Sequence, residues 1–248
     1  MLYRSIIFLL LLAGTSVTRS QNIAVAVAAS VKPVIDELTM WFDLKTDNKV
    51  SVISGSSGNL TTQILNGAPY DLFLSADTHY CRVLFDKNAA LTEPKIYAYG
   101  KLILLSHHQI DSARGMNVLL EPWIRKIAIA NPQIAPYGAA AVEALRYYQL
   151  YDTLKSKFVF GESIAQANQF LSTGSAEISI TSASAAIQDS TNGKTYPYSV
   201  DAKAYKPISH AMVILHHGKD NPAVKKFYEF ISSDKAKEIF QKYGFALP

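Results

Sequence analysis

The stretch VSVISGSSGNLTTQI, residues 50–64, decides how the rest of the sequence is interpreted. A β-branched run breaks into small polar residues, and Leu60 and Ile64 then resume at helical spacing, which predicts a strand, a tight loop and a helix. The start of such a helix offers unpaired N–H donors and the positive end of a dipole, and Gly55 and Gly58 let a ligand approach the backbone. The loop therefore predicts an anion site. The simpler alternative is a plain connection whose serines only cap the helix.

The first twenty residues predict an export signal. Arg4 precedes an apolar run from Ile6 to Ala13, and small residues follow as far as Ser20. This is the pattern of a secretory signal at residues 1–20, and the run is too short to span a bilayer. We therefore expect a mature chain that is soluble and periplasmic after cleavage.

The charge and the cysteine content narrow the range of partners. Loss of the signal removes Arg4 and Arg19 and lowers the formal charge from +4 to +2. A nucleic-acid partner demands a clear basic face, so none is expected. The single cysteine, Cys81, cannot form an internal disulfide, and stability must come from the core. We expect the protein to act as a monomer.

Short apolar strands alternate with amphipathic helices along the chain. One set begins at Ile23 and a second set of similar size begins at Ile127. Repeated strand and helix units indicate parallel sheets, so we expect an α/β fold with two lobes, each a mostly parallel sheet flanked by helices. The expected division places residues 21–100 and 206–248 in lobe 1 and residues 101–205 in lobe 2.

Polar side chains mark the expected starts of several helices. Their oxygens can accept hydrogen bonds from the free amides of a first turn. The candidate caps are Ser30, Asp77, Ser163 and Asn221. An alanine-rich helix is expected over residues 139–150, after a loop that contains Tyr137 and Gly138.

Five small, polar loops follow the ends of expected strands. Ligands of open parallel sheets bind at the carboxyl ends of the strands, so we expect these loops to converge. A cleft lined by hydroxyls, amides and helix N-termini suits an oxyanion and does not suit a cation. Because the loops bring no catalytic base, they favour binding over catalysis. The loops are residues 28–30, 54–59, 136–138, 162–164 and 181–182.

Two other kinds of chemistry have less support. The sequence GSSG at 55–58 lacks the G-x-S-x-G spacing of a nucleophile elbow, which leaves an exported serine hydrolase as a remote alternative. Histidine pairs occur at 107–108 and 216–217, but neighbours on a strand point to opposite faces and cannot both bind one ion. We expect no catalytic residue, and no metal site unless a metal oxyanion counts as one.

Several segments resemble a known family. They are AAS at 28–30, NGAPYDLFLSAD at 66–77, YDTL at 151–154 and IFQKYGF at 239–245. In this order, over essentially the whole mature chain, the sequence resembles the molybdate-binding periplasmic proteins of ABC importers. The resemblance implies a two-lobe periplasmic-binding-protein fold of type II that traps a tetrahedral dianion in the cleft between its lobes. It also implies delivery to an inner-membrane ABC permease with its ATPase, molybdate or tungstate as the bound ligand, and no cofactor.

The resemblance implies five ligand positions as well. Hydroxyl donors fall on Ser30 and Ser57, backbone amides fall on Tyr137 and Ile164, and a tyrosine hydroxyl of the family falls on Ser182. Many members have a small residue at the position of Tyr137, and we hypothesise that its phenol compensates for the one lost at Ser182.

Neutral donors of this kind select among anions by protonation state. They can hold a fully deprotonated dianion, because hydrogen bonds to a charged acceptor are strong. Hydrogen phosphate would also need an acceptor, usually a carboxylate, which the five positions do not supply. Sulfate or another tetrahedral oxyanion remains the alternative ligand.

Overall fold

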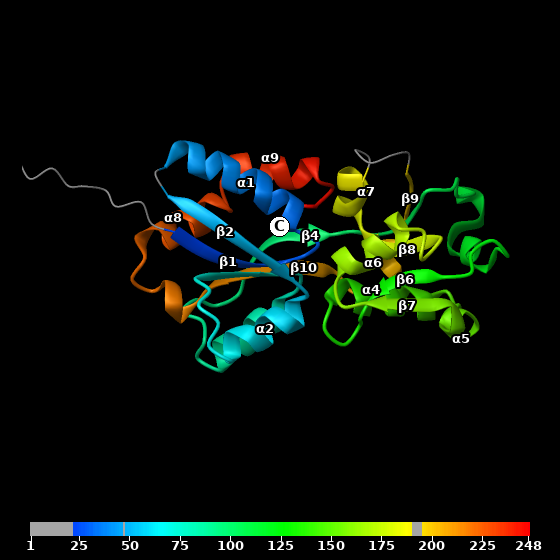
Figure 1. Ribbon diagram of the computed structural model, residues 1–248, viewed down its shortest axis with the longest axis horizontal. Coiled ribbons are helices and arrows are strands. Elements are labelled where there is room, and N and C mark those ends of the chain that lie inside the picture. Colours follow the sequence, from blue (N-terminus) through cyan, green and yellow to red (C-terminus); the bar gives the residue numbers. More distant parts are fainter. Residues whose placement is uncertain (1–21, 47, 190–194) are drawn as a thin grey trace, which may run out of the picture.

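The computed structural model describes residues 22–46, 48–189 and 195–248. Two sheets form the centres of two lobes that lie side by side along the longest axis (Figure 1). The expected export signal lies outside the described residues. Within the described ranges, no helix has the length and apolar character that crossing a membrane requires.

The sheet of lobe 1 has the strand order β2-β1-β3-β10-β4. Strand β1 pairs in parallel with β2 and β3, and β10 pairs antiparallel with β3 and β4. Helices α1 and α9 lie on one side of the sheet and α2 on the other (Figure 1). The elements are β1 Asn22–Ala28, α1 Lys32–Lys45, β2 Lys49–Gly55, α2 Ser57–Leu65, β3 Leu72–Ser75, α3 Thr78–Asp86, β4 Lys95–Gly100, β10 Ile208–Ile214, η4 His216–Gly218, α8 Pro222–Phe230 and α9 Asp234–Lys242.

The sheet of lobe 2 has the strand order β7-β6-β8-β5-β9. Strand β6 pairs in parallel with β7 and β8, and β5 pairs antiparallel with β8 and β9. Helices α4 and α6 both pack on this sheet. The elements are β5 Leu102–Ser106, η1 Ser112–Leu120, β6 Ile127–Ala130, α4 Pro136–Tyr147, α5 Tyr151–Leu154, η2 Lys155–Lys157, β7 Phe158–Gly161, α6 Ile164–Ser172, β8 Ile178–Ser182, α7 Ala183–Asp189, β9 Tyr196–Ser199 and η3 Ala202–Ala204.

Each sheet is mixed but mostly parallel in strand direction, because one strand runs opposite to the others, β10 in lobe 1 and β5 in lobe 2. Strand β1 pairs in parallel with both β2 and β3. Helices connect these strands along the chain, as parallel crossovers require. The antiparallel pairs involve the strands next to the passages between the lobes. The chain leaves the first sheet after Gly100 and returns at Ile208, so β10 can run opposite to β4. The prediction of a two-lobe α/β fold is confirmed.

Strand β1 shows how a sheet divides the core of its lobe. Val25 and Val27 belong to the buried cluster that includes α1, whereas Ala26 between them belongs to the cluster that includes Leu60 of α2 and Cys81 of α3. Successive side chains on a strand point to opposite faces, so β1 is apolar from Ile23 to Ala28 because both of its faces are covered. Burial also raises the pKa of the Cys81 thiol, which makes it unreactive.

The predicted helix starts are correct in most cases. The side chains that accept a first-turn amide are Asp77, Ser163 and Asn221. Ser30 does not cap α1, because the residue at the cap position is Val31, whose side chain makes no capping hydrogen bond. Helix α4 begins at Pro136, earlier than expected, because proline suits the first turn of a helix. Tyr137 therefore lies in a helical first turn rather than in a loop.

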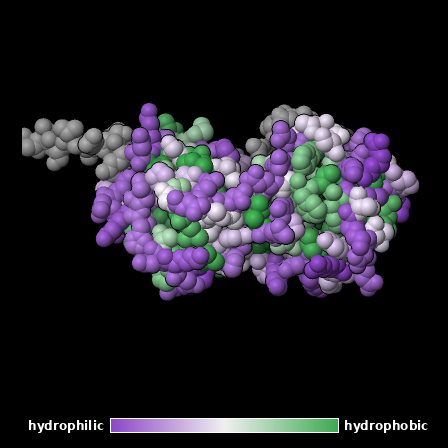
Figure 2. Space-filling model, turned by 60° about the horizontal axis from the view of Figure 1, so that its bottom comes forward, coloured by the Kyte–Doolittle hydropathy of each residue, from purple (hydrophilic) through white to green (hydrophobic). Residues whose placement is uncertain are grey.

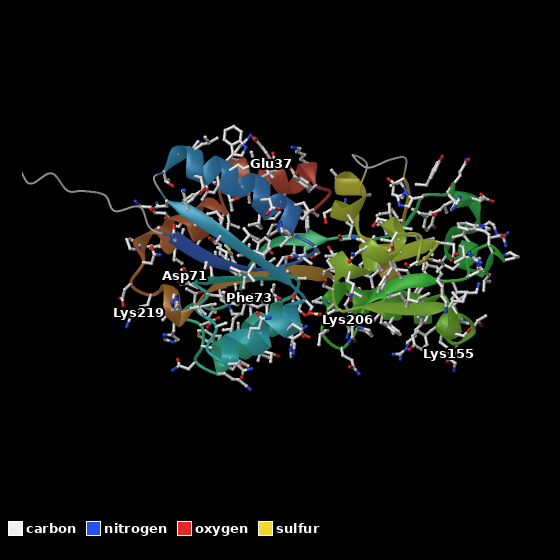
Figure 3. All side chains as sticks on the ribbon, in the orientation of Figure 1. Glu37, Asp71, Phe73, Lys155, Lys206 and Lys219 are labelled. Atoms are coloured by element: carbon white, nitrogen blue, oxygen red, sulfur yellow. The ribbon has the colours of Figure 1, made fainter. Side chains whose placement is uncertain are left out.

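Hydrogen bonds join the C-terminal end of the chain, at helix α9, to helix α1. Glu37 of α1, labelled in Figure 3, accepts hydrogen bonds at its Oε2 from Lys242 Nζ at 2.7 Å and from the Tyr243 hydroxyl at 3.0 Å. The end of the chain is thus part of lobe 1. Figure 2 shows the two lobes as broad masses joined at a narrower waist.

Candidate functional site

A small cavity lies between the lobes, where loops that follow strands in both sheets meet. Four of the five predicted ligand residues line it. None of the residues that line the cavity is charged. Two of the lysines labelled in Figure 3, Lys155 and Lys219, lie near opposite ends of the molecule. The cavity is lined by Ala28, Ala29, Ser30, Gly55, Ser56, Ser57, Ala76, Ala135, Pro136, Tyr137 and Ile164.

Ser30 brings an unused hydroxyl to this cavity. The residue is only 3% exposed, and its Oγ has no hydrogen-bond partner within the described ranges. A buried hydroxyl without a partner costs about 1–3 kcal/mol of stability. Ser30 is therefore poised to donate to, or accept from, a group in the cavity.

The hydroxyl of Ser57 already accepts one hydrogen bond. It is the first residue of α2, and the cap before it is Ser56, whose Oγ accepts from Asn59 N. The Ser57 Oγ accepts the N–H of Ala76 at 3.0 Å, and the residue is 1% exposed. A hydroxyl has one proton to give, and this bond does not use it. The Ser57 proton and the Ser57 amide can both serve an anion.

Lobe 2 brings backbone amides rather than hydroxyls. Tyr137 lies in the first turn of α4, whose cap residue Ala135 offers no side-chain acceptor. Ile164 is the first residue of α6, and the Ser163 side chain caps the amide of Gln166 instead. The first amides of a helix have no acceptor within that helix, and they carry the positive end of its dipole. These two helix starts face the start of α2 across the cavity.

Two glycines allow the backbone segments around the cavity to come close. A Cβ at Gly138 would lie 2.1 Å from the carbonyl oxygen of Ala130, so only glycine lets α4 begin so near the end of β6. A Cβ at Gly58 would lie 2.9 Å from the Cβ of Ile134, which belongs to the other lobe. The Gly58 amide donates to the Ile134 carbonyl at 2.9 Å.

Further hydrogen bonds between side chains and the opposite lobe lie near the cavity. Asn59 Nδ2 donates to Glu162 Oε1 at 2.6 Å, and the Tyr80 hydroxyl donates to the Gln133 carbonyl at 3.2 Å. Both join the α2–α3 side of lobe 1 to loops of lobe 2. The lobes are thus in direct contact around the cavity, which describes a closed conformation.

Ser182 is placed differently from the other four predicted residues. It lines a neighbouring cavity of about 300 Å³ between the lobes. Ser184 Oγ donates to the Ser30 carbonyl at 2.6 Å and lies 2.9 Å from Ser182 Oγ. Because the Ser184 proton goes to Ser30, Ser182 must be the donor in the bond between the two serines. The Ser182 proton then goes to Ser184 Oγ within lobe 2 and is not offered to the smaller cavity, while the Ser184 proton joins the lobes.

The Tyr137 phenol does not take the place of the tyrosine missing at Ser182. Its hydroxyl lies 3.3 Å from Nε2 of His210, in a fully buried position, and burial raises its pKa. The hypothesis that this phenol compensates is wrong. Tyr137 offers its amide to the cavity, while its side chain is engaged elsewhere.

Several residues of this region were not found from the sequence. Ser184 and the Ala76 amide act through partners distant in the chain, and no local pattern marks them. Ser56 lies next to Ser57 in the same loop, but it is the cap residue of α2. The resemblance chose Ser57 rather than Ser56, and the structure places Ser57 one residue inside the helix, where the amide is also free.

The cavity has the groups needed for binding an anion and lacks those needed for hydrolysis. No histidine, cysteine or carboxylate is among its lining residues, so nothing there can act as a base towards Ser57. The histidine pairs at 107–108 and 216–217 lie outside strands, contrary to the geometry assumed above. In the described ranges, no group of three or more side chains is arranged to hold a metal ion.

A sequence model of the family described as "bacterial extracellular solute-binding protein" matches residues 23–246. The match spans both lobes and every residue that lines the cavity. This chain belongs to that family. A solute-binding protein is not an enzyme, so the hydrolase alternative is excluded.

Relatives of this solute-binding protein are named after an oxyanion. The molybdate-binding protein ModA of Azotobacter vinelandii is 36% identical, and the similarity covers 92% of this chain and 91% of that one. The protein of the same name from Rhodobacter capsulatus is 35% identical, with 90% and 88% covered. The structure of the Azotobacter vinelandii periplasmic molybdate-binding protein superposes with a TM-score of 0.85, at 32% identity, over 91% of this chain and 99% of that one.

Proposed function

We propose that this protein captures molybdate, and tungstate as its close analogue, between its two lobes. The donors are the hydroxyls of Ser30 and Ser57 on lobe 1 and the amides of Tyr137 and Ile164 on lobe 2. Ser182 contributes indirectly, by donating to Ser184 Oγ, whose own proton goes to the Ser30 carbonyl of lobe 1. The relatives named for molybdate support this choice of ligand.

One observation carries the proposal. Neutral donors from both lobes meet in a cavity whose lining residues include neither a cation nor a carboxylate. Oriented hydroxyls and amides can replace the hydration shell of a dianion, because bonds to a charged acceptor are about twice as strong as neutral ones. The same set offers no carboxylate to accept the proton of hydrogen phosphate. A fully deprotonated tetrahedral dianion fits these groups best.

We further propose that binding and lobe closure are one event. The expected lobes, residues 21–100 with 206–248 and residues 101–205, would move about the two passages near Gly100 and residues 200–207. Because the anion needs donors from both lobes, it would stabilise the closed form over the open one.

The protein would then deliver its cargo to a membrane transporter. A Bacillus subtilis relative, 28% identical, is named a putative ABC transporter substrate-binding lipoprotein. We propose that this protein acts as a periplasmic monomer, released from the signal at residues 1–20, and loads an inner-membrane ABC permease driven by its ATPase.

Calorimetric competition on the mature chain tests the ligand. We expect saturable heat with molybdate and tungstate, and no displacement of either by an equal concentration of sulfate or phosphate. Displacement by sulfate would assign the site to sulfate instead. No heat with any group-six oxyanion, chromate included, would contradict the proposal.

A further inference from the structure

His210 is a buried histidine with no part in the proposed ligand shell. It lies on β10, is 0% exposed, and sits at a register shift in the pairing with β4. Its ring stands between two phenols, with Nδ1 3.4 Å from the Tyr97 hydroxyl and Nε2 3.3 Å from the Tyr137 hydroxyl. The ring of Phe245 packs edge-on at 5.1 Å. These contacts hold the imidazole at the junction of the lobes.

The directions of these hydrogen bonds follow from proton counting. The Tyr97 hydroxyl donates its single proton to the Ser75 carbonyl at 3.3 Å, so it can only accept from His210. Burial lowers the pKa of His210 to about 3, so the ring is neutral and has one N–H. That N–H is on Nδ1, facing Tyr97. Nε2 is then the acceptor, and the Tyr137 hydroxyl donates to it.

The chain of bonds continues to the cavity through one peptide group. The carbonyl of Ser75 and the N–H of Ala76 belong to the same peptide unit, and that N–H donates to Ser57 Oγ at 3.0 Å. Every donor from Tyr137 through His210 and Tyr97 points the same way. Hydrogen bonds in such a series polarise one another, which strengthens the last donor. The last donor is the Ser57 hydroxyl, whose own proton is free for the cavity.

The series crosses from one lobe to the other. Tyr137 belongs to α4 in lobe 2, while His210, Tyr97 and Ser57 belong to lobe 1. The crossing requires a glycine at position 100, because a Cβ there would lie 2.0 Å from the Tyr137 hydroxyl and 3.0 Å from His210 Nε2. The first bond of the series therefore joins the two lobes beside Gly100.

We infer that His210 is a positioning residue that couples the Tyr137 hydroxyl of lobe 2 to the donor strength of Ser57 in lobe 1 through Tyr97 and the Ser75–Ala76 peptide. The inference rests on the proposed function for its effect on anion affinity. No proton is transferred along the series. Each group keeps its own proton.

A double-mutant cycle tests the coupling. Tyr137→Phe removes the first donor and leaves the Tyr137 amide in place, and Tyr97→Phe breaks the series in its middle. We expect each variant to weaken molybdate binding about 3- to 10-fold, the range for loss of a neutral hydrogen bond. In a Ser57→Ala background the same changes should cost less than about twofold, because the series no longer ends on a donor. Equal costs in both backgrounds would overturn the inference.

A control separates the relay from a general loss of a phenol. Tyr70→Phe removes a hydroxyl that donates to Gln63 Oε1 at 2.8 Å within lobe 1, and we expect it to leave affinity unchanged. A loss of affinity in Tyr70→Phe equal to that in Tyr137→Phe would count against the relay.

A measurement without ligand keeps the inference independent of the ligand's identity. Nitrogen NMR of ¹⁵N-histidine-labelled protein should show His210 protonated on Nδ1 only, and Tyr137→Phe should shift the Nε2 signal. A proton on Nε2 in the unaltered chain would overturn the relay. If the unaltered chain binds no group-six oxyanion while Nδ1 is protonated, the proposed function fails and the hydrogen-bond series stands.

Discussion

The two halves of the cavity supply donors of different kinds. Lobe 1 lines it with the hydroxyls of Ser30 and Ser57 and with the Ser57 amide, while lobe 2 lines it with the backbone amides of Tyr137 and Ile164. A hydroxyl donor depends on the residue type, whereas an amide donor depends only on where a helix begins. The half in lobe 1 can therefore be altered by ordinary substitutions, but the half in lobe 2 changes only when a backbone N–H is removed.

The largest effect is expected where both kinds of donor coincide. Ser57→Pro removes a hydroxyl and an amide together, and proline fits the first position of α2 because Ser56 before it is extended, with ψ of 148°. Each bond to a charged ligand is worth about 1.5–3 kcal/mol, so affinity should fall by a factor of ~10²–10⁴. Ser57→Ala should lose roughly half of this on a logarithmic scale. Calorimetry that gave equal losses for both variants would show that the Ser57 amide is not used.

The half in lobe 2 is tested by removing an amide without breaking its helix. Ile164→Pro replaces the first residue of α6, and Ser163 before it is extended, with ψ of 172°. Loss of this one donor should weaken binding by a factor of ~10–150. Ile164→Val keeps the amide and is the matched control, with unchanged affinity expected. Tight binding by the proline variant, measured by calorimetry, would remove Ile164 from the ligand shell.

Ser30→Ala should separate affinity from stability. The variant loses a donor to the anion, and we expect about tenfold weaker binding by calorimetry. Without ligand, its thermal midpoint should stay equal or rise, because the buried Ser30 hydroxyl has no partner within the described ranges. A clear fall in the midpoint, measured by calorimetric unfolding, would show that this hydroxyl supports the fold.

Changes in pH are expected to have the smallest effect on binding. No residue that lines the cavity titrates near neutrality, so affinity should not change between pH 8 and pH 6.

Stability should respond at lower pH, through His210. Its pKa is about 3 in the folded chain, against 6.5 as its ordinary value, so the unfolded chain binds the proton first. The contribution of His210 is present above pH 6.5 and is lost as pH falls towards 3, with a slope of about 1.4 kcal/mol per pH unit. Titration followed by NMR should show His210 neutral at pH 5, and a charged ring there would contradict its burial between phenols.

The difference between side-chain donors and backbone donors also explains what the sequence could predict. Side-chain features were visible, such as the cap at Asp77 and the polar loop that ends in Ser57. Helix starts were found to within a few residues. The resemblance implied the amides of Tyr137 and Ile164 as donors, and both residues line the cavity. The two-lobe α/β fold followed from the alternation of strands and helices.

The details that the sequence missed or misplaced involve contacts between distant parts of the chain. The antiparallel β10 depends on the return from lobe 2, which leaves no periodic signal. Ser30 resembled a helix cap because serine favours both roles, and only its geometry separates them. The resemblance placed Ser182 in the ligand set, which stays a prediction, and no sequence pattern marks the bond from its hydroxyl to Ser184 Oγ. His210 gave no signal at all, since its partners are 73 and 113 residues away.

A crystal structure of the mature chain with tungstate tests the central claim most directly, because the metal can be located by its anomalous scattering. The account predicts one anion in the cavity between the lobes. Its oxygens should lie within about 3 Å of the Ser30 and Ser57 hydroxyls and of the Tyr137 and Ile164 amides. An anion bound elsewhere, or Ser57 Oγ turned away from it, would contradict the account.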